Sequence, residues 1–348
     1  MQSASNNSSP HLSGPQSVTR VMGMVLLALV PGTLAMLWFF GWGILINLGI
    51  AIITAVAAEA AVLRLRGREV TSTLMDLSAV VTAWLLALAL PTLLPWWQTV
   101  LGTAFAIILV KQLFGGIGHN PFNPAMAGYV LLLVSFPVTM TRGLPPEVVS
   151  GNAISLADSL HIIFSGTPPL GQTWDAISSA TPLDQMRTEL SQHRMISEIR
   201  QSPLWGDFGG RGWEWIGNWF LVGGLFLIWQ RVISWRIPAS MLGALLLVAG
   251  LFWMIDPDTH PSPAFHLFSG GAILGAFFIA TDPVSASTTP RGQLVYGALI
   301  GLFVFIIRTW GGYPDAVAFS VLLLNMAAPT IDYYTQPRIF GQREDRDA

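Results

Sequence analysis

Residues 42–63 read WGILINLGIAIITAVAAEAAVL, an apolar run with a single acidic residue, Glu59. About 20 consecutive apolar residues are enough for an α-helix to cross the hydrocarbon core of a bilayer. Arg64, Arg66 and Arg68 follow directly, and arginine and lysine gather on the cytoplasmic side of membrane helices. The stretch therefore predicts a helix that crosses a membrane and ends at its cytoplasmic surface.

Nine more apolar runs lie along the chain, several of them short or broken by glycine and proline. They span 21–39, 75–94, 97–114, 125–140, 215–229, 239–255, 264–280, 294–307 and 316–331. Hydrophobic residues make up 52% of the chain and charged residues 10%, against about 25% charged in soluble domains. We therefore expect an all-α polytopic membrane protein with about ten transmembrane helices.

The basic residues predict the orientation of these helices. With the N-terminus inside, the basic residues that follow the second, fourth, sixth, eighth and tenth runs fall on the cytoplasmic side, and Arg308 at the outer end of the ninth run is the exception. We expect both termini to be cytoplasmic and the protein to lie in a bacterial inner membrane. A net charge of −2 gives no indication of nucleic-acid binding, so membrane lipid is the expected surrounding.

One long connection without an apolar run divides the chain. We expect a cytoplasmic segment at 1–20, a first transmembrane half at 21–140, a periplasmic loop at 141–212, a second half at 213–334 and a cytoplasmic tail at 335–348. About five helices in each half would make the halves inverted in topology, a plan common in transporters. The two halves show no sequence identity that proves a duplication.

The long loop contains a helix start. Thr181 is a good N-cap, Pro182 suits the first helical position, and Asp184 stands where a capping-box acid would. The pattern predicts a helix over 182–192, and this local role alone would account for the three residues.

Residues 175–181, DAISSAT, also resemble the flavinylation motif of redox-driven ion pumps. The matching positions are Asp175, Ser178, Ala180 and the acceptor Thr181, with a small residue between Ser178 and Ala180. The resemblance implies FMN joined to the Thr181 hydroxyl through a phosphoester by a flavin transferase. A phosphate at a helix N-terminus would be favoured by free N–H groups and the helix dipole.

Three further segments are similar to one family. They are GGIGHNPFNPAMAG at 115–128, ATDPVSAS at 280–287 with PRG at 290–292, and LNMAAPTID at 324–332. These segments resemble the family that contains the D subunit of the Rnf complex and the NqrB subunit of the sodium-pumping quinone reductase. The likeness extends from about residue 9 to residue 332, and the D-subunit branch fits better.

The resemblance implies a function. Such a complex passes electrons between NADH and ferredoxin and couples this to movement of Na⁺ or H⁺. The chain would carry covalent FMN, and a non-covalent riboflavin is a further cofactor that the resemblance implies. The partners would be the A, B, C, E and G subunits, which would supply the NADH site and iron–sulfur clusters. The absence of cysteine agrees, because cysteine thiolates hold such clusters.

Charged residues inside spans are costly and therefore functional candidates. By resemblance to NqrB, we expect the ion path to include Glu59, Asp282 and Asp332. Glu59, which stands nearly a turn and a half before Arg64, could instead pair locally or lie at the interface. Asp282 could instead form a turn with the proline that follows.

Lys111 and His119 could bind a phosphate or a partner carboxylate. For Lys111, at the end of a run, we expect instead that the ammonium extends to the membrane surface.

Two other functions are compatible with the same sequence. A flavin-free secondary transporter or channel of inverted design would need the acidic residues and interrupted helices but not Thr181. A structural subunit that only holds its partners together would need neither the acidic residues and interrupted helices nor Thr181. Trp205, Trp213 and Trp215 are candidates to stack on a flavin ring or to anchor the chain at the interface.

Overall fold

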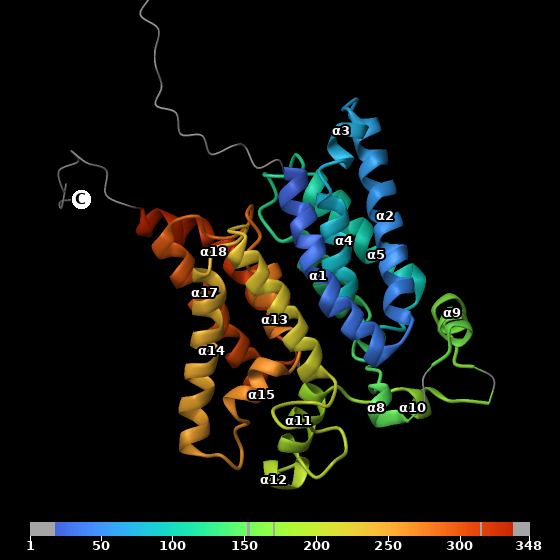
Figure 1. Ribbon diagram of the computed structural model, residues 1–348, viewed down its shortest axis with the longest axis vertical. Coiled ribbons are helices and arrows are strands. Elements are labelled where there is room, and N and C mark those ends of the chain that lie inside the picture. Colours follow the sequence, from blue (N-terminus) through green and yellow to red (C-terminus); the bar gives the residue numbers. More distant parts are fainter. Residues whose placement is uncertain (1–17, 152–153, 170, 314, 337–348) are drawn as a thin grey trace, which may run out of the picture.

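The computed structural model describes residues 18–151, 154–169, 171–313 and 315–336. Over these ranges the chain is helical and forms no strand beyond two isolated bridges, Gly143–Ser179 and Trp205–Gly210. Figure 1 shows two groups of helices side by side, with a set of short helices gathered at one end. The all-α fold class is confirmed.

The first group contains long helices and one π-helix. It comprises α1 (Val18–Phe40), α2 (Gly43–Leu65), α3 (Val70–Leu74), α4 (Ser78–Ala89), α5 (Trp96–Phe105), η1 (Ala106–Gln112), α6 (Pro124–Ser135) and α7 (Pro137–Met140). α5 runs directly into η1, whose i→i+5 hydrogen bonds are rare and often occur at functional sites.

The connection and the second group follow in chain order. The connection carries α8 (Glu147–Ser150), α9 (Leu156–Ser165), α10 (Trp174–Ile177), α11 (Pro182–Ser191) and α12 (Ile196–Ile199). The second group comprises α13 (Trp213–Trp229), α14 (Arg236–Ile255), α15 (Pro263–Phe268), α16 (Ala272–Leu274), η2 (Gly275–Ile279), α17 (Pro290–Trp310) and α18 (Val317–Thr335).

Five helices are long and apolar enough to cross a membrane: α1, α2, α14, α17 and α18. Each of the ten predicted runs contains helix, but the other five consist of shorter or interrupted helices. The protein is thus a multi-helix membrane chain, and a count of ten crossings stays a prediction.

The two groups repeat one local design. In the first, α3 is followed by Leu77 in the left-handed conformation (φ 63°) and then by α4. In the second, α15 is followed by Gly270 (φ 64°) and then by α16. Across the interface α1 packs on α13, and α6 packs on α18.

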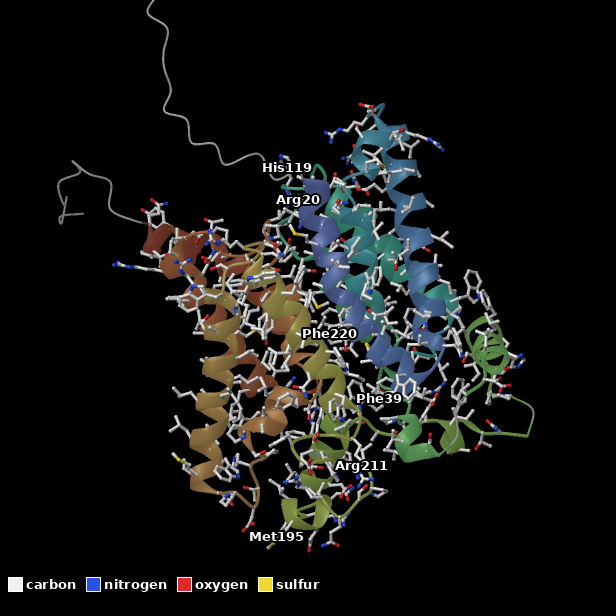
Figure 2. All side chains as sticks on the ribbon, viewed as in Figure 1. Arg20, Phe39, His119, Met195, Arg211 and Phe220 are labelled. Atoms are coloured by element: carbon white, nitrogen blue, oxygen red, sulfur yellow. The ribbon has the colours of Figure 1, made fainter. Side chains whose placement is uncertain are left out.

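Both ends of the described chain lie at the same end of the molecule (Figure 1). α1 begins and α18 ends at the end of the molecule that is opposite α8–α12 (Figure 1). Arg20 and His119 lie at the first end, and Met195 and Arg211 at the other (Figure 2). The predicted topology, with both termini on one side of the membrane and the long loop on the other, requires the chain ends and α8–α12 to lie at opposite ends. Residues 1–17 and 337–348 of the two expected cytoplasmic segments lie outside the described residues.

Candidate functional site

Thr181 begins α11 as its N-cap. Its backbone is extended (φ −68°, ψ 159°), Pro182 occupies the first helical position, and Thr181 Oγ1 accepts a hydrogen bond from the backbone amide of Asp184 at 3.2 Å. The predicted helix start is confirmed. The Thr181 side chain therefore stands at the positive end of the helix dipole, where an anion is favoured.

The segment before Thr181 is held by the chain that leaves the first helix group. The Ser179 amide donates to the Gly143 carbonyl at 3.0 Å, and a Cβ added at Gly143 would lie 2.7 Å from the Ser179 carbonyl oxygen. The Ser178 hydroxyl donates to the Trp174 carbonyl at 2.8 Å, and the Arg142 guanidinium lies 4.0 Å from the Trp174 ring centroid. These contacts fix the position of Thr181.

A cavity of about 190 Å³ opens beside Thr181, between the two helix groups. Thr181, Asp184 and Arg142 lie on its wall, together with five aromatic side chains: Phe40, Tyr129, Trp213, Phe220 and Tyr313. Burial raises the pKa of the Asp184 carboxyl, and Arg187 offsets part of the rise. A planar aromatic group attached at Thr181 would find apolar and aromatic walls here.

The motif residues differ in exposure. Asp175 and Ala180 are exposed, whereas Ser178 and Thr181 are half-buried. An enzyme that modified Thr181 could therefore contact the exposed motif residues Asp175 and Ala180. Of the three candidate tryptophans, Trp213 lines the cavity, Trp205 is buried against Phe265, and Trp215 is exposed.

Lys111 is not at the membrane surface, so that expectation was wrong. Its side chain is 3% exposed, and its ammonium donates to Glu59 Oε1 and to Ser78 Oγ, each at 2.6 Å. Glu59, which is fully buried, pairs with Lys111 and not with the exposed Arg64. The reason is that two opposite charges offset each other's burial cost only when they are in contact.

A second cavity, of about 130 Å³, separates the helix groups on the side of Val21 and Val232. Lys111, Ser78 and Asp282 lie on its wall. The structure therefore brings Asp282 to the same cavity as the Glu59–Lys111 pair.

The two other motif carboxylates also accept hydrogen bonds. Asp282 Oδ2 accepts from the Ser285 hydroxyl at 2.7 Å, as expected of a turn. Asp332 is not part of the cavity wall, and its carboxylate accepts from Ser287, Thr288 and Thr289. Asp332 ties α18 to the loop before α17.

Arg308 was noted in the sequence only as an exception to the charge rule. It is buried, and its guanidinium donates to the carbonyls of His266 at 2.5 Å and Ser269 at 3.1 Å. Arg308, which lies on α17, thus fixes the position of α15 and of the turn between α15 and α16. The feature of the sequence that could have indicated this buried role is that Arg308 departs from the charge pattern of the other basic residues.

The two helix groups, their interrupted helices and the polar residues between them define a polytopic membrane protein with sites at a central interface. The chain belongs to the NQR2, RnfD, RnfE family, whose sequence profile matches residues 5–341. It is 53% identical over 344 residues to the D subunit of the ion-translocating oxidoreductase complex of Yersinia pestis, covering 97% of this chain and 98% of that protein.

Proteins of the same name from Escherichia coli O127:H6 and Aeromonas hydrophila are 51% and 52% identical over 345 and 343 residues, with the same coverage. The resemblance stated from the sequence motifs is confirmed.

Proposed function

We propose that the chain is the D subunit, a membrane component, of an ion-translocating oxidoreductase complex. The support is an identity above 50% over nearly the whole length of relatives that carry this name. The complex would transfer electrons between NADH and ferredoxin and move Na⁺ or H⁺ across the inner membrane. The A, B, C, E and G subunits would be its partners, and the chain would catalyse no reaction alone.

The observation that supports a flavin is the place of Thr181. Its hydroxyl stands at the N-terminus of α11 and on the wall of an aromatic cavity. A phosphoester there would lie at the positive end of the α11 dipole, with Arg142 on the same cavity wall. FMN, when bound, supplies electron-carrier chemistry that protein side chains lack. A non-covalent riboflavin is the second cofactor that we propose.

The repeated design supports inverted halves. A short helix, a left-handed residue and a second helix occur once in each group. Inverted repeats with interrupted helices are also the plan of secondary transporters, so a flavin-free transporter is the second candidate function. In the topology that we propose, the α8–α12 loop with Thr181 is periplasmic and both termini are cytoplasmic.

The experiment compares wild type with Thr181→Ala, each expressed with the flavin transferase. After denaturation in SDS, the wild-type band should fluoresce as a flavin and the Thr181→Ala band should not. Thr188→Ala is the matched control because Thr188 is exposed on the same helix; it should keep the fluorescence. A dark wild-type band, with the transferase shown to be active, would favour the transporter.

A further inference from the structure

Lys111 is the only lysine in a chain that has 17 basic residues, and it lies in a buried cluster of oxygen acceptors. Besides Lys111, the Gln112 amide nitrogen donates to Glu59 Oε1 at 2.6 Å. Ser78 Oγ, which accepts from Lys111, donates in turn to the Asp76 carboxylate. A lysine ammonium is a compact point charge, unlike the planar fork of arginine, and so occupies the space of a small cation.

Two oxygens in this cluster have no hydrogen-bond partner: Glu59 Oε2 and Gln112 Oε1. Glu59 is 0% and Gln112 1% exposed. Leaving a buried acceptor unpaired is unfavourable, and more so when the group is charged. Both orphaned groups are acceptors, which a cation or a hydrogen-bond donor would satisfy and an anion would not.

The cluster borders a cavity between the helix groups. Lys111 and Ser78 lie on the wall of the 130 Å³ cavity between the helix groups. The π-helix that carries Lys111 and Gln112 is fixed at its end by Arg66, whose guanidinium donates to the Gln112 carbonyl at 2.5 Å. A cation can therefore reach Lys111 from the cavity while the backbone of η1 stays in place.

The second helix group has no such cluster at the corresponding position of its described residues. Counted from the start of each helix, Glu59 of α2 corresponds to Phe252 of α14, which packs against Phe305 with ring centroids 5.1 Å apart. Its buried cation, Arg308, donates to backbone carbonyls in the bonds described above. Among the described residues, the carboxylate site belongs to the first group alone.

We propose that the Lys111 ammonium is a resident cation in a monovalent-cation site formed by Glu59, Gln112 and Ser78, and that the translocated cation displaces it. The proposal deepens the proposed ion-transport function by naming the place where the cation binds. Na⁺ and H⁺ share the required chemistry, a single positive charge on oxygen acceptors. When Lys111 is displaced, its amine moves toward the cavity.

The test uses Lys111 as its own reporter. The purified wild-type complex is given a short pulse of acetic anhydride in NaCl or in choline chloride at equal ionic strength and at two pH values. Peptide mass gives the acetylated fraction of Lys111, normalised to an added lysine peptide that corrects for the reagent's own pH dependence. If Na⁺ displaces Lys111, acetylation should rise about tenfold in NaCl; if H⁺ does, it should rise at the lower pH in both salts.

Two variants complete the experiment. Glu59→Gln removes the charge that holds Lys111 and should give high acetylation in every condition, whereas Glu69→Gln, an exposed carboxylate, should behave as wild type. Acetylation that changes with neither Na⁺ nor pH in wild type, or that stays low in Glu59→Gln, would overturn the proposal. Repeating the pulse on Thr181→Ala separates the cation site from the covalent flavin. Because the cation site needs no flavin, acetylation of Lys111 in this variant should respond to Na⁺ and pH as it does in wild type.

Discussion

The Asn325 side chain accepts a hydrogen bond at 3.1 Å from the backbone amide of Asn123, which lies 202 residues earlier in the chain. The Asn325 amide nitrogen also donates to the Ser285 carbonyl at 3.1 Å and to the Tyr296 hydroxyl at 2.8 Å. One buried side chain thus joins the three segments that carry the family resemblance, 115–128, 280–287 and 324–332. The three motifs therefore meet at one buried side chain.

Replacing Asn325 should weaken the contact between the helix groups. Asn325→Leu keeps the size of the side chain but removes three hydrogen bonds, so we expect the free energy of unfolding to fall by about 3 kcal/mol. Equilibrium unfolding of the solubilised protein in mixed SDS micelles measures this. Asn218→Leu, at an exposed position of α13, is the control, and an equal effect of both variants would contradict the prediction.

Gly143 should be required for flavin attachment. A Cβ at this position would lie 2.7 Å from the Ser179 carbonyl oxygen and 3.2 Å from Thr181 Cγ2, so Gly143→Ala should push the motif away from the cavity. We expect less flavin per protein in the in-gel fluorescence assay. Gly243→Ala, where nothing lies within 4 Å of the added Cβ, should retain the wild-type amount, and full flavin in Gly143→Ala would exclude this role.

Arg308→Lys should not be conservative. The guanidinium of Arg308 reaches two carbonyls, those of His266 and Ser269, and a single ammonium cannot reproduce the fork. We expect a loss of about 2 kcal/mol of stability, since hydrogen bonds to charged groups contribute about 1.5–3 kcal/mol. Arg291→Lys, at an exposed position, should change the unfolding midpoint little; equal midpoints for the two variants would refute the prediction.

Asp184 should make the stability of the α11 region depend on pH. Burial raises the pKa of the folded-state carboxyl, with Arg187 lowering it in part. The stability from this group is present below its ordinary pKa of about 3.9 and is lost as the pH rises through the raised value. Asp184→Asn should therefore become more stable than wild type as the pH rises above about 4.

The unfolding midpoint at several pH values measures this gain, which should be small because Asp184 is half exposed. Asp207→Asn, an exposed carboxyl on the same loop, should show no such trend. A gain at low pH instead would reverse the sign and contradict the assignment.

The features that the sequence predicted correctly depend on neighbouring residues or on the composition of one segment. The start of α11 depends on three neighbouring residues, Thr181, Pro182 and Asp184, and each apolar run depends on its own composition. The partner of Lys111 could not be predicted this way, because Glu59 lies 52 residues earlier and a π-helix changes the periodicity that places side chains. The buried roles of Arg308 and Asn325 likewise depend on contacts between distant helices.

The most direct measurement is the mass of the tryptic peptide 143–187, which contains Thr181, from protein made with the flavin transferase. The account predicts an increase equal to FMN less one water, with fragmentation placing the added mass on Thr181. A peptide of unmodified mass, from a preparation in which the transferase modifies a known acceptor, would contradict the covalent flavin and leave the flavin-free transporter as the better account.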